Sequence, residues 1–256
     1  MPHDTPSEIR IIGITGMPEI QPGDDLAALL VTAAQAQGAA IQPGDVVVVT
    51  QKVVSKAEGR VVRLEDVTPS PLAVTISQGH RRDPRHTEVV QRESKRIVRM
   101  DRGVIISETY HGFICANAGV DASNVPGATT LCLLPVDPDA SARRIRQGIQ
   151  QRLGVTTAVI ISDTFGRPWR SGATNVAIGV AGMDPMQSYV GQEDAHGKTL
   201  HTTVLCVADE LAAAAELAAG KVLGVPVVLI RGYPYQPSES ASHQALLRDP
   251  DKDLFR

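Results

Sequence analysis

The sequence predicts a mixed α and β protein, and three observations support this fold class. Short runs of β-branched residues alternate along the chain with amphipathic stretches of helical periodicity. Hydrophobic residues make up 43% of the 256 residues but aromatic ones only 3%, so the core must consist of Val, Ile, Leu and Ala. The 22 Gly and 17 Pro fall well below the roughly 25–30% that marks a low-complexity chain, which indicates a globular protein.

The N-terminal part is predicted to contain a strand, a helix and a second strand. Residues 9–14 form an apolar run typical of a strand, and Asp24 or Asp25 can cap the helix that follows. The apolar residues of this helix recur at the spacing of one helix face, at Leu26, Leu29, Leu30 and Ala33. Gly38 then ends the helix, and the four Val residues at 46–49 predict a strand buried on both faces.

The remainder of the chain continues this alternation. Further strands are predicted at residues 104–106, 130–134, 157–161, 176–180 and 227–230, and helices at residues 141–153 and 204–219. Between them, the basic stretch 81–102 has a mostly helical pattern, which fits either a solvated helix face or a contact with an anionic substrate. Residues 236–256, rich in Ser, His, Asp and Lys, are predicted to form a mobile or lid-like tail.

Charge and composition exclude several classes of function. A net charge of −3 creates no strong attraction to nucleic acid or to an anionic membrane. Three Phe, one Trp and four Tyr are too few for a platform that stacks single-stranded bases. Three cysteines are too few for a disulfide framework. Because the sequence also shows no signal-like segment and no run of 18 apolar residues, we expect a cytoplasmic protein.

The familiar nucleotide-binding motifs are absent or incomplete. Gly197-Lys198-Thr199 resembles the end of a P-loop, but Gln192 stands where that motif needs its first glycine, and two acids follow it. The dinucleotide pattern G-x-G-x-x-G, the hydrolase pattern G-x-S-x-G and Cys/His clusters with zinc spacing do not occur. The chemistry must therefore come from a different set of residues.

Two aspartates and a lysine form a set suited to metal and phosphate. Asp163 follows an apolar run, so its carboxylate should emerge with the Thr164 hydroxyl at the carboxyl end of a strand, where α/β sheets place ligands. Asp121 is the single charge in a segment of small and polar residues, which suits a cation with oxygen ligands. Lys56 follows an apolar strand and can neutralise a phosphate. The alternatives are a turn or helix cap for each Asp and a surface position for the lysine. Together these groups are the minimum for phosphoryl transfer.

Four longer segments resemble the coenzyme F420:L-glutamate ligase family, the γ-glutamyl ligases that complete this deazaflavin coenzyme. The first comprises GMPE at residues 16–19 with PGDDL at 22–26, and the second is GDVVVVTQKVVSKAEGR at 44–60. The third is NAGVDASNV at 117–125 and the fourth SDTFGRPWR at 162–170. Because these segments are long and ordered, and the likeness extends over most of the chain, the chain is identified as a single-domain, bacterial-type member of the family.

The resemblance implies a GTP-dependent ligase. The enzyme would join the α-amino group of L-glutamate to the carboxylate of the phospholactyl coenzyme F420 precursor, and would then add γ-linked glutamate. An acyl phosphate would be the intermediate, and GDP and phosphate would be released. The implied fold is an α+β intertwined homodimer, with residues 1–256 as one catalytic unit or two interwoven subdomains. Mg²⁺ or Mn²⁺ is the implied metal, and K⁺ an implied activator.

The resemblance also extends to individual residues. Those expected at the GTP site are Gly16, Met17, Pro18, Glu19, Gln51, Lys52, Lys56, Asn124, Gly220 and Lys221. The metal is expected on Asp121, Asp163 and Thr164. Lys56 and Arg167 are expected to act in catalysis, with a structural ion pair as the alternative for Arg167. The loop 219–225 departs from some relatives because it contains no acid, and its Lys221 is either a phosphate contact or an exposed loop lysine.

Two other functions remain open from the sequence. A related acyl-phosphate ligase could act on a different carboxylate, and a non-catalytic protein could bind nucleotide or deazaflavin. Any stacking on guanine or on the deazaflavin must use one of the few aromatic residues. Phe165 and Trp169, which follow Asp163, are the first candidates.

Overall fold

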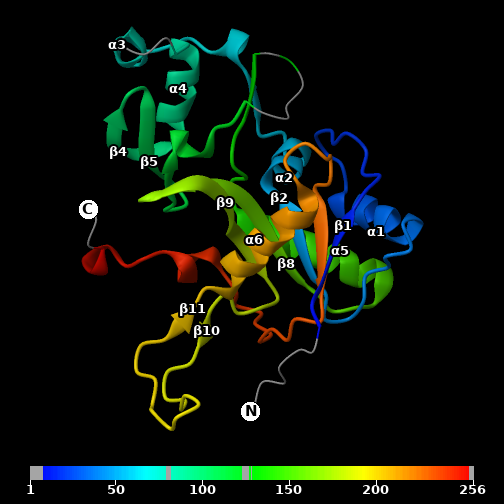
Figure 1. Cartoon of the computed structure of the whole chain (residues 1–256). Helices are drawn as coiled ribbons and strands as arrows, with labels where there is room; N and C mark the ends of the chain where they lie inside the picture. Colours follow the sequence, from blue (N-terminus) through cyan, green and yellow to red (C-terminus); the bar gives the residue numbers. More distant parts are fainter. Residues whose placement is uncertain (1–7, 79–81, 123–126, 128, 254–256) are drawn as a thin grey trace.

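A five-stranded mixed sheet is the centre of the computed structural model, which describes residues 8–78, 82–122, 127 and 129–253 (Figure 1). In spatial order the strands are β1 (Arg10–Ile14), β12 (Val227–Arg231), β2 (Val46–Thr50), β8 (Ala158–Arg167) and β9 (Arg170–Ala181). β12 is antiparallel to both β1 and β2, while β8 is parallel to β2 and antiparallel to β9. Consequently β1, β2 and β8 run in the same direction; β1 and β2 end at the same edge of the sheet, and β8 continues beyond it.

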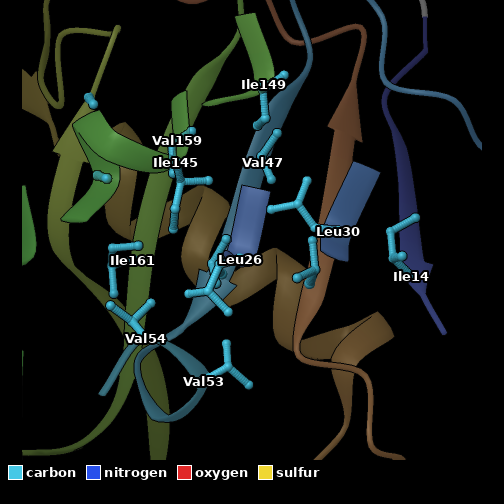
Figure 2. Packing of buried hydrophobic residues seen from close by; sticks show 14 of the residues in the cluster. Ile14, Leu26, Leu30, Val47, Val53, Val54, Ile145, Ile149, Val159 and Ile161 are labelled. Atoms are coloured by element: carbon cyan, nitrogen blue, oxygen red, sulfur yellow. The ribbon is translucent and has the colours of Figure 1, made fainter. Parts of the chain in front are cut away.

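Helices cover both faces of this sheet. They are α1 (Leu26–Ala36), α5 (Pro138–Leu153) and α6 (Val207–Ala219). Helices α1 and α5 lie on one face, where Val47 of β2 packs with Leu30 and Ile145 (Figure 2). Helix α6 lies on the other face, where Val46 and Val48 belong to a second core. Each of the four valines of β2 is at most 2% exposed, which confirms the predicted strand buried on both faces.

A smaller unit lies beside the main sheet, at the top of Figure 1. Its elements are β3 (Val61–Arg63), α3 (Pro71–Gln78), α4 (Pro84–Arg92), β4 (Ser94–Asp101), β5 (Val104–Thr109), β6 (Ile114–Ala116) and β7 (Thr130–Cys132). Strands β4, β5 and β6 form an antiparallel sheet, and β3 pairs with β7. Val89 and Val90 of α4 pack with Ile105 and Leu131 in a core of their own. The mixed α and β class predicted from the sequence is confirmed.

The structure corrects the prediction of a mostly helical stretch at residues 81–102. Helix α4 ends at Arg92, and β4 occupies Ser94–Asp101. The buried carboxylate of Glu108 on β5 accepts hydrogen bonds from Lys95 Nζ at 3.0 Å and from Arg96 Nε at 2.6 Å on β4. These pairs across the two strands, together with the backbone ladder, stabilise the extended conformation against the local helical pattern.

The other predicted elements are confirmed, with ends set by caps and turns. Asp25 caps α1 by accepting a hydrogen bond from the Ala28 amide at 3.0 Å. Helix α5 begins three residues before its predicted start because Asp137 caps it in the same way. Helix α6 begins later than predicted, because the preceding residues form β11 (Val204–Leu205), which pairs with β10 (Gln187–Ser188) in a hairpin arm seen at the bottom of Figure 1.

Part of the predicted tail, residues 236–256, packs against the body of the protein. Asp139 at the start of α5 accepts hydrogen bonds from Ser242 Oγ at 2.7 Å and from His243 Nδ1 at 2.9 Å, and the His243 side chain is buried. Short 3-10 helices follow at His243–Leu246 and Pro250–Lys252. The structure thus places a fixed contact inside this segment, while its role as a lid stays a prediction.

Replacing Asp139 by Ala should destabilise the protein strongly. Burial by itself would raise the pKa of Asp139. The hydrogen bonds from His243, from the Val180 amide and from Ser242 lower it by more, so the pKa lies below its ordinary value. Removing the carboxylate leaves these buried donors unpaired, which should cost roughly 3 kcal/mol of unfolding free energy in urea denaturation. Ser242→Ala removes only one of these donors, together with the exposed bond that its hydroxyl accepts from the Gln244 amide, and should cost about 1 kcal/mol. Equal losses in the two variants would contradict this account.

Gly179 is predicted to be irreplaceable because α5 begins directly against β9. A Cβ atom at Gly179 would lie 2.5 Å from the carbonyl carbon and oxygen of Pro138. Gly179→Ala should therefore lower the free energy of unfolding by about 1–3 kcal/mol through overpacking. Gly166→Ala is the matched control on the neighbouring strand, since no atom lies within 4 Å of its added Cβ. It should change stability by less than about 0.5 kcal/mol.

Candidate active site

The candidate site lies at the edge of the sheet where β1 and β2 end and β8 continues outward. Ile14, Val227, Val49 and Ile161 form one row of backbone pairs across the four strands β1, β12, β2 and β8. Just beyond this row, the Thr50 amide donates to the carbonyl of Pro226 at 2.9 Å. The carboxyl ends of parallel strands are the usual place for ligands in open α/β sheets.

A pocket of about 550 Å³ opens at this edge. Its walls come from residues 17–20, the start of α2 (Gln51–Ala57), residues 162–164 of β8, the C-terminal turn of α6 and the loop 220–226. Pockets of roughly 300–1,000 Å³ are typical for small-molecule and cofactor sites. Most residues predicted from the sequence to bind nucleotide or metal thus line one cavity. Gly16 and Asp121 are not among its lining residues, and Asn124 lies outside the described residues.

Two ammonium groups of α2 line the pocket. Lys52 and Lys56 are four residues apart and therefore lie on one face of the helix. Lys56 Nζ donates to Glu19 Oε1 at 2.6 Å, and Lys52 Nζ donates to Asp121 Oδ2 at 2.5 Å. Lys56 was predicted from the sequence to follow a strand, whereas more than one turn of α2 separates it from the end of β2. These fixed cations suit a ligand that carries phosphate groups.

Asp163 occupies an irregular point within β8. The predicted strand 157–161 in fact continues to Arg167, paired with β9, but the register shifts between Ile161 and Ser162. Bulges of this kind re-aim side chains and are common beside active sites. Burial raises the pKa of Asp163 to about 6, against a lowering by the Thr164 amide and by Lys52. The carboxylate is therefore held at the pocket wall in an environment that favours a neighbouring cation.

The predicted metal ligands offer a set of oxygen donors. Asp163 and Thr164 line the pocket, and Asp121 is close enough to Asp163 to raise its pKa. Within the described residues, no three His, Cys, Asp or Glu side chains form a metal-holding group. Mg²⁺ takes only one or two carboxylates and completes its shell with phosphate oxygens and water. The two aspartates and the threonine hydroxyl fit such a cation, and their assignment as ligands stays a prediction.

Two polar residues of the pocket, Asn175 and Glu216, were not predicted from the sequence. Thr164 Oγ1 donates to Asn175 Oδ1 at 2.8 Å, and Asn175 Nδ2 donates to Glu216 Oε2 at 2.9 Å. Lys221 Nζ reaches Thr164 Oγ1 at 3.3 Å, so this predicted phosphate contact also lies at the pocket. The available signal was weak: a lone Asn within β-rich sequence, and one Glu in an Ala-rich helix.

Three further residues predicted at the nucleotide site differ in how they lie relative to the pocket. Gly220 follows the last residue of α6, adopts φ 58° and lines the pocket, while its contact with GTP stays a prediction. Gly16 stands next to the lining residues Met17 and Pro18 but does not itself line the pocket. Gln51 lines it too, yet its side chain is buried and donates to the carbonyl of Leu133 at 2.7 Å. Any contact of Gln51 with a nucleotide would therefore use its main chain.

Arg167 and the two candidate aromatic residues are not in the pocket lining. Arg167 lies at the exposed end of the β8–β9 hairpin, and its guanidinium donates to the carbonyl of Ser171 at 3.0 Å. This contact matches a structural role, and the catalytic role of Arg167 stays a prediction. Trp169 is 80% exposed on the same hairpin, and Phe165 packs edge-on against Phe113. Neither ring is placed to stack on a ligand inside the cavity.

Comparison with known proteins identifies the family. A family model described as F420-0:Gamma-glutamyl ligase matches residues 15–232. The chain belongs to this family. It is 46% identical to the coenzyme F420:L-glutamate ligase of Methanothermobacter thermautotrophicus over 97% of this chain and 99% of that protein. The enzyme of the same name from Methanopyrus kandleri is 41% identical over 93% of this chain and 94% of its own length. The one from Haloarcula marismortui is 40% identical over 97% and 96%.

The match of an F420-0:gamma-glutamyl ligase confirms the family and the ligase class predicted from the sequence. It covers every segment that lines the pocket, from Met17 to Pro226. In the part of the chain that the structure describes, no helix combines the length and apolar character needed to cross a bilayer. The pocket at the ends of β1 and β2, beside residues 162–164 of β8, is accordingly the candidate active site of this ligase.

Proposed function

We propose that this chain is a GTP-dependent ligase that adds L-glutamate to the coenzyme F420 precursor. The first glutamate would join by its α-amino group to the phospholactyl carboxylate, and further residues would be γ-linked. The observation that carries the proposal is one pocket lined by Lys52, Lys56, Lys221 and Asp163, in a chain of this family. Ammonium groups for phosphate and a carboxylate for a cation are what phosphoryl transfer requires.

The chemistry follows from the weakness of a carboxylate as an electrophile. In the proposed sequence, an oxygen of the precursor carboxylate attacks the γ-phosphorus of GTP, and the bridging oxygen leaves with its electron pair as GDP. The neutral amine of glutamate then attacks the carbonyl carbon of the acyl phosphate, phosphate leaves, and the amine loses its proton. Lys56 offsets negative charge on the transferring phosphoryl group, where a fixed cation in a partly enclosed site is most effective.

Asp163, Thr164 and Asp121 would hold Mg²⁺ or Mn²⁺ beside the phosphates. When bound, such an ion neutralises charge on phosphate oxygens. Lys52 pairs with Asp121 and also lowers the pKa of Asp163, so this lysine couples the two carboxylates electrostatically. K⁺ as an activator and an intertwined homodimer as the assembly belong to the same proposal, and both rest on the family resemblance.

A mass measurement of reaction products tests the proposal. Purified protein is incubated with GTP, Mn²⁺, L-glutamate and the unglutamylated precursor, with ATP in place of GTP as the control. Products heavier by whole glutamate units, formed together with GDP and only with GTP, support the ligase. GTP turnover only with another carboxylic acid indicates a related ligase with a different substrate. Binding of nucleotide without any turnover indicates a non-catalytic binding protein, and either of these results overturns the proposal.

A further inference from the structure

The pocket contains a directional hydrogen-bond chain that runs from β8 through β9 to α6. Thr164 and Asn175 are directly paired residues on the two strands, and Glu216 lies one turn before the end of α6. The Thr164 hydroxyl bonds to Asn175 Oδ1 at 2.8 Å, and Asn175 Nδ2 bonds to Glu216 Oε2 at 2.9 Å. One chain of hydrogen bonds thus links side chains from three elements.

Glu216 fixes the direction of this chain. An ionised carboxylate can only accept, so the Asn175 amide must turn its NH₂ group toward Glu216 and its oxygen toward Thr164. Thr164 must then donate its single proton to Asn175, which leaves the lone pairs of its oxygen for other partners. Lys221 Nζ lies 3.3 Å from that oxygen, so the lone pairs already meet a cationic group of the pocket.

Burial makes this arrangement rigid. Asn175 is only 4% exposed, and both ends of its amide group are hydrogen-bonded within the protein. Reversing the amide would place its NH₂ group against the threonine hydroxyl and its oxygen against the carboxylate of Glu216. Two oxygen acceptors would then face each other in a poorly solvated place, which is unfavourable.

We propose that Glu216 and Asn175 are positioning residues that orient the Thr164 oxygen as an acceptor for a divalent cation. This inference rests on the proposed function, because Thr164 is a predicted metal ligand there. Neither residue needs to touch the metal or the substrate. Residues behind a ligand commonly set its orientation, and their loss costs about 10- to 100-fold in metal affinity.

The test measures Mn²⁺ affinity directly, from the loss of the free-ion electron paramagnetic resonance signal in the presence of GDP. Glu216→Gln removes the carboxylate that fixes the orientation of the Asn175 amide. Asn175→Asp places a second carboxylate next to that of Glu216. Each variant should bind Mn²⁺ about 10- to 100-fold more weakly. Glu210→Gln changes an exposed acid on the same helix and should leave the affinity unchanged.

The exchanged pair Glu216→Gln with Asn175→Asp supplies the decisive measurement. It keeps the total charge and restores the direction of the chain, since the new amide donates and the new carboxylate accepts from Thr164. The double variant should therefore recover most of the affinity, as a coupled pair does in a double-mutant cycle. No recovery would mean that Glu216 acts in another way, for example as a direct ligand.

The outcomes separate this inference from the proposed function. If the wild-type protein binds Mn²⁺ and both single variants bind it equally well, the positioning role is wrong while the proposed function stands. If the wild-type protein does not bind Mn²⁺ even with GDP, the metal role in the proposed function is wrong, and the inference fails with it. Circular dichroism of each variant shows whether the fold is retained, and the exchanged pair covers the case in which a single variant does not fold.

Discussion

Replacing Asp163 by Asn should make the metal-free protein more stable and the ligase inactive. Burial raises the pKa of Asp163 from 3.8 to about 6. The folded-state pKa exceeds the unfolded one. The free energy of unfolding therefore has its full value below about pH 4, where Asp163 is protonated in both states, and decreases as the pH rises through 6. Above that pH the ionised carboxylate costs the folded state up to about 3 kcal/mol, at 1.36 kcal/mol for each pKa unit.

The asparagine variant avoids this cost because its amide cannot ionise. In EDTA at pH 8 its melting temperature should be higher than that of the wild type by roughly 3–8 °C, and the difference should be smaller at pH 5. Asp121→Asn is the matched control: this carboxylate is 40% exposed and paired with Lys52, so its loss should not stabilise the protein. A less stable Asp163→Asn variant at pH 8 would contradict the effect of burial.

The activity of the same variant tests the predicted metal role. An amide oxygen carries no net charge and holds a divalent cation more weakly than a carboxylate does. GTP-dependent glutamylation should therefore fall by at least about 100-fold at ordinary Mn²⁺ concentrations, in a protein that is better folded than the wild type. Gain of stability with loss of function is the pattern expected where a destabilising buried charge serves catalysis. Full activity of the Asp163→Asn variant would show that Asp163 is not a metal ligand of the active site.

Much of the site could be predicted because its residues belong to local sequence patterns. Asp163 follows a run of buried β-strand residues, and the four valines of β2 indicate by composition alone that this strand is central. The cap of α1 at Asp25 follows from a short-range rule of helix starts. In each case the physical cause lies within a few residues, so a single sequence contains it.

The remaining features depend on contacts between distant segments. Asn175 and Glu216 are 41 residues apart, and only the packing of α6 on β9 brings them together. The second half of the helical pattern at residues 81–102 forms β4 instead, because Glu108 on the next strand, β5, pairs with Arg96. Helix propensity depends only on the local sequence and does not include such a partner. Tertiary contacts then decide the local structure.

Replacing Lys56 by Met should reduce turnover far more than stability. The side chain is only 12% exposed, and methionine keeps most of its aliphatic stem while removing the ammonium group. The ion pair with Glu19, whose carboxylate is 58% exposed, should contribute at most about 1 kcal/mol to folding. Loss of one preorganised charge at the phosphoryl group should instead lower kcat by on the order of 10²–10³-fold.

Glu19→Gln is the control, because it breaks the same pair but leaves the cation in the pocket, and it should retain most of the turnover. A Lys56→Met protein that is folded and as active as the Glu19→Gln variant would show that the pair, and not the charge, is what the site requires.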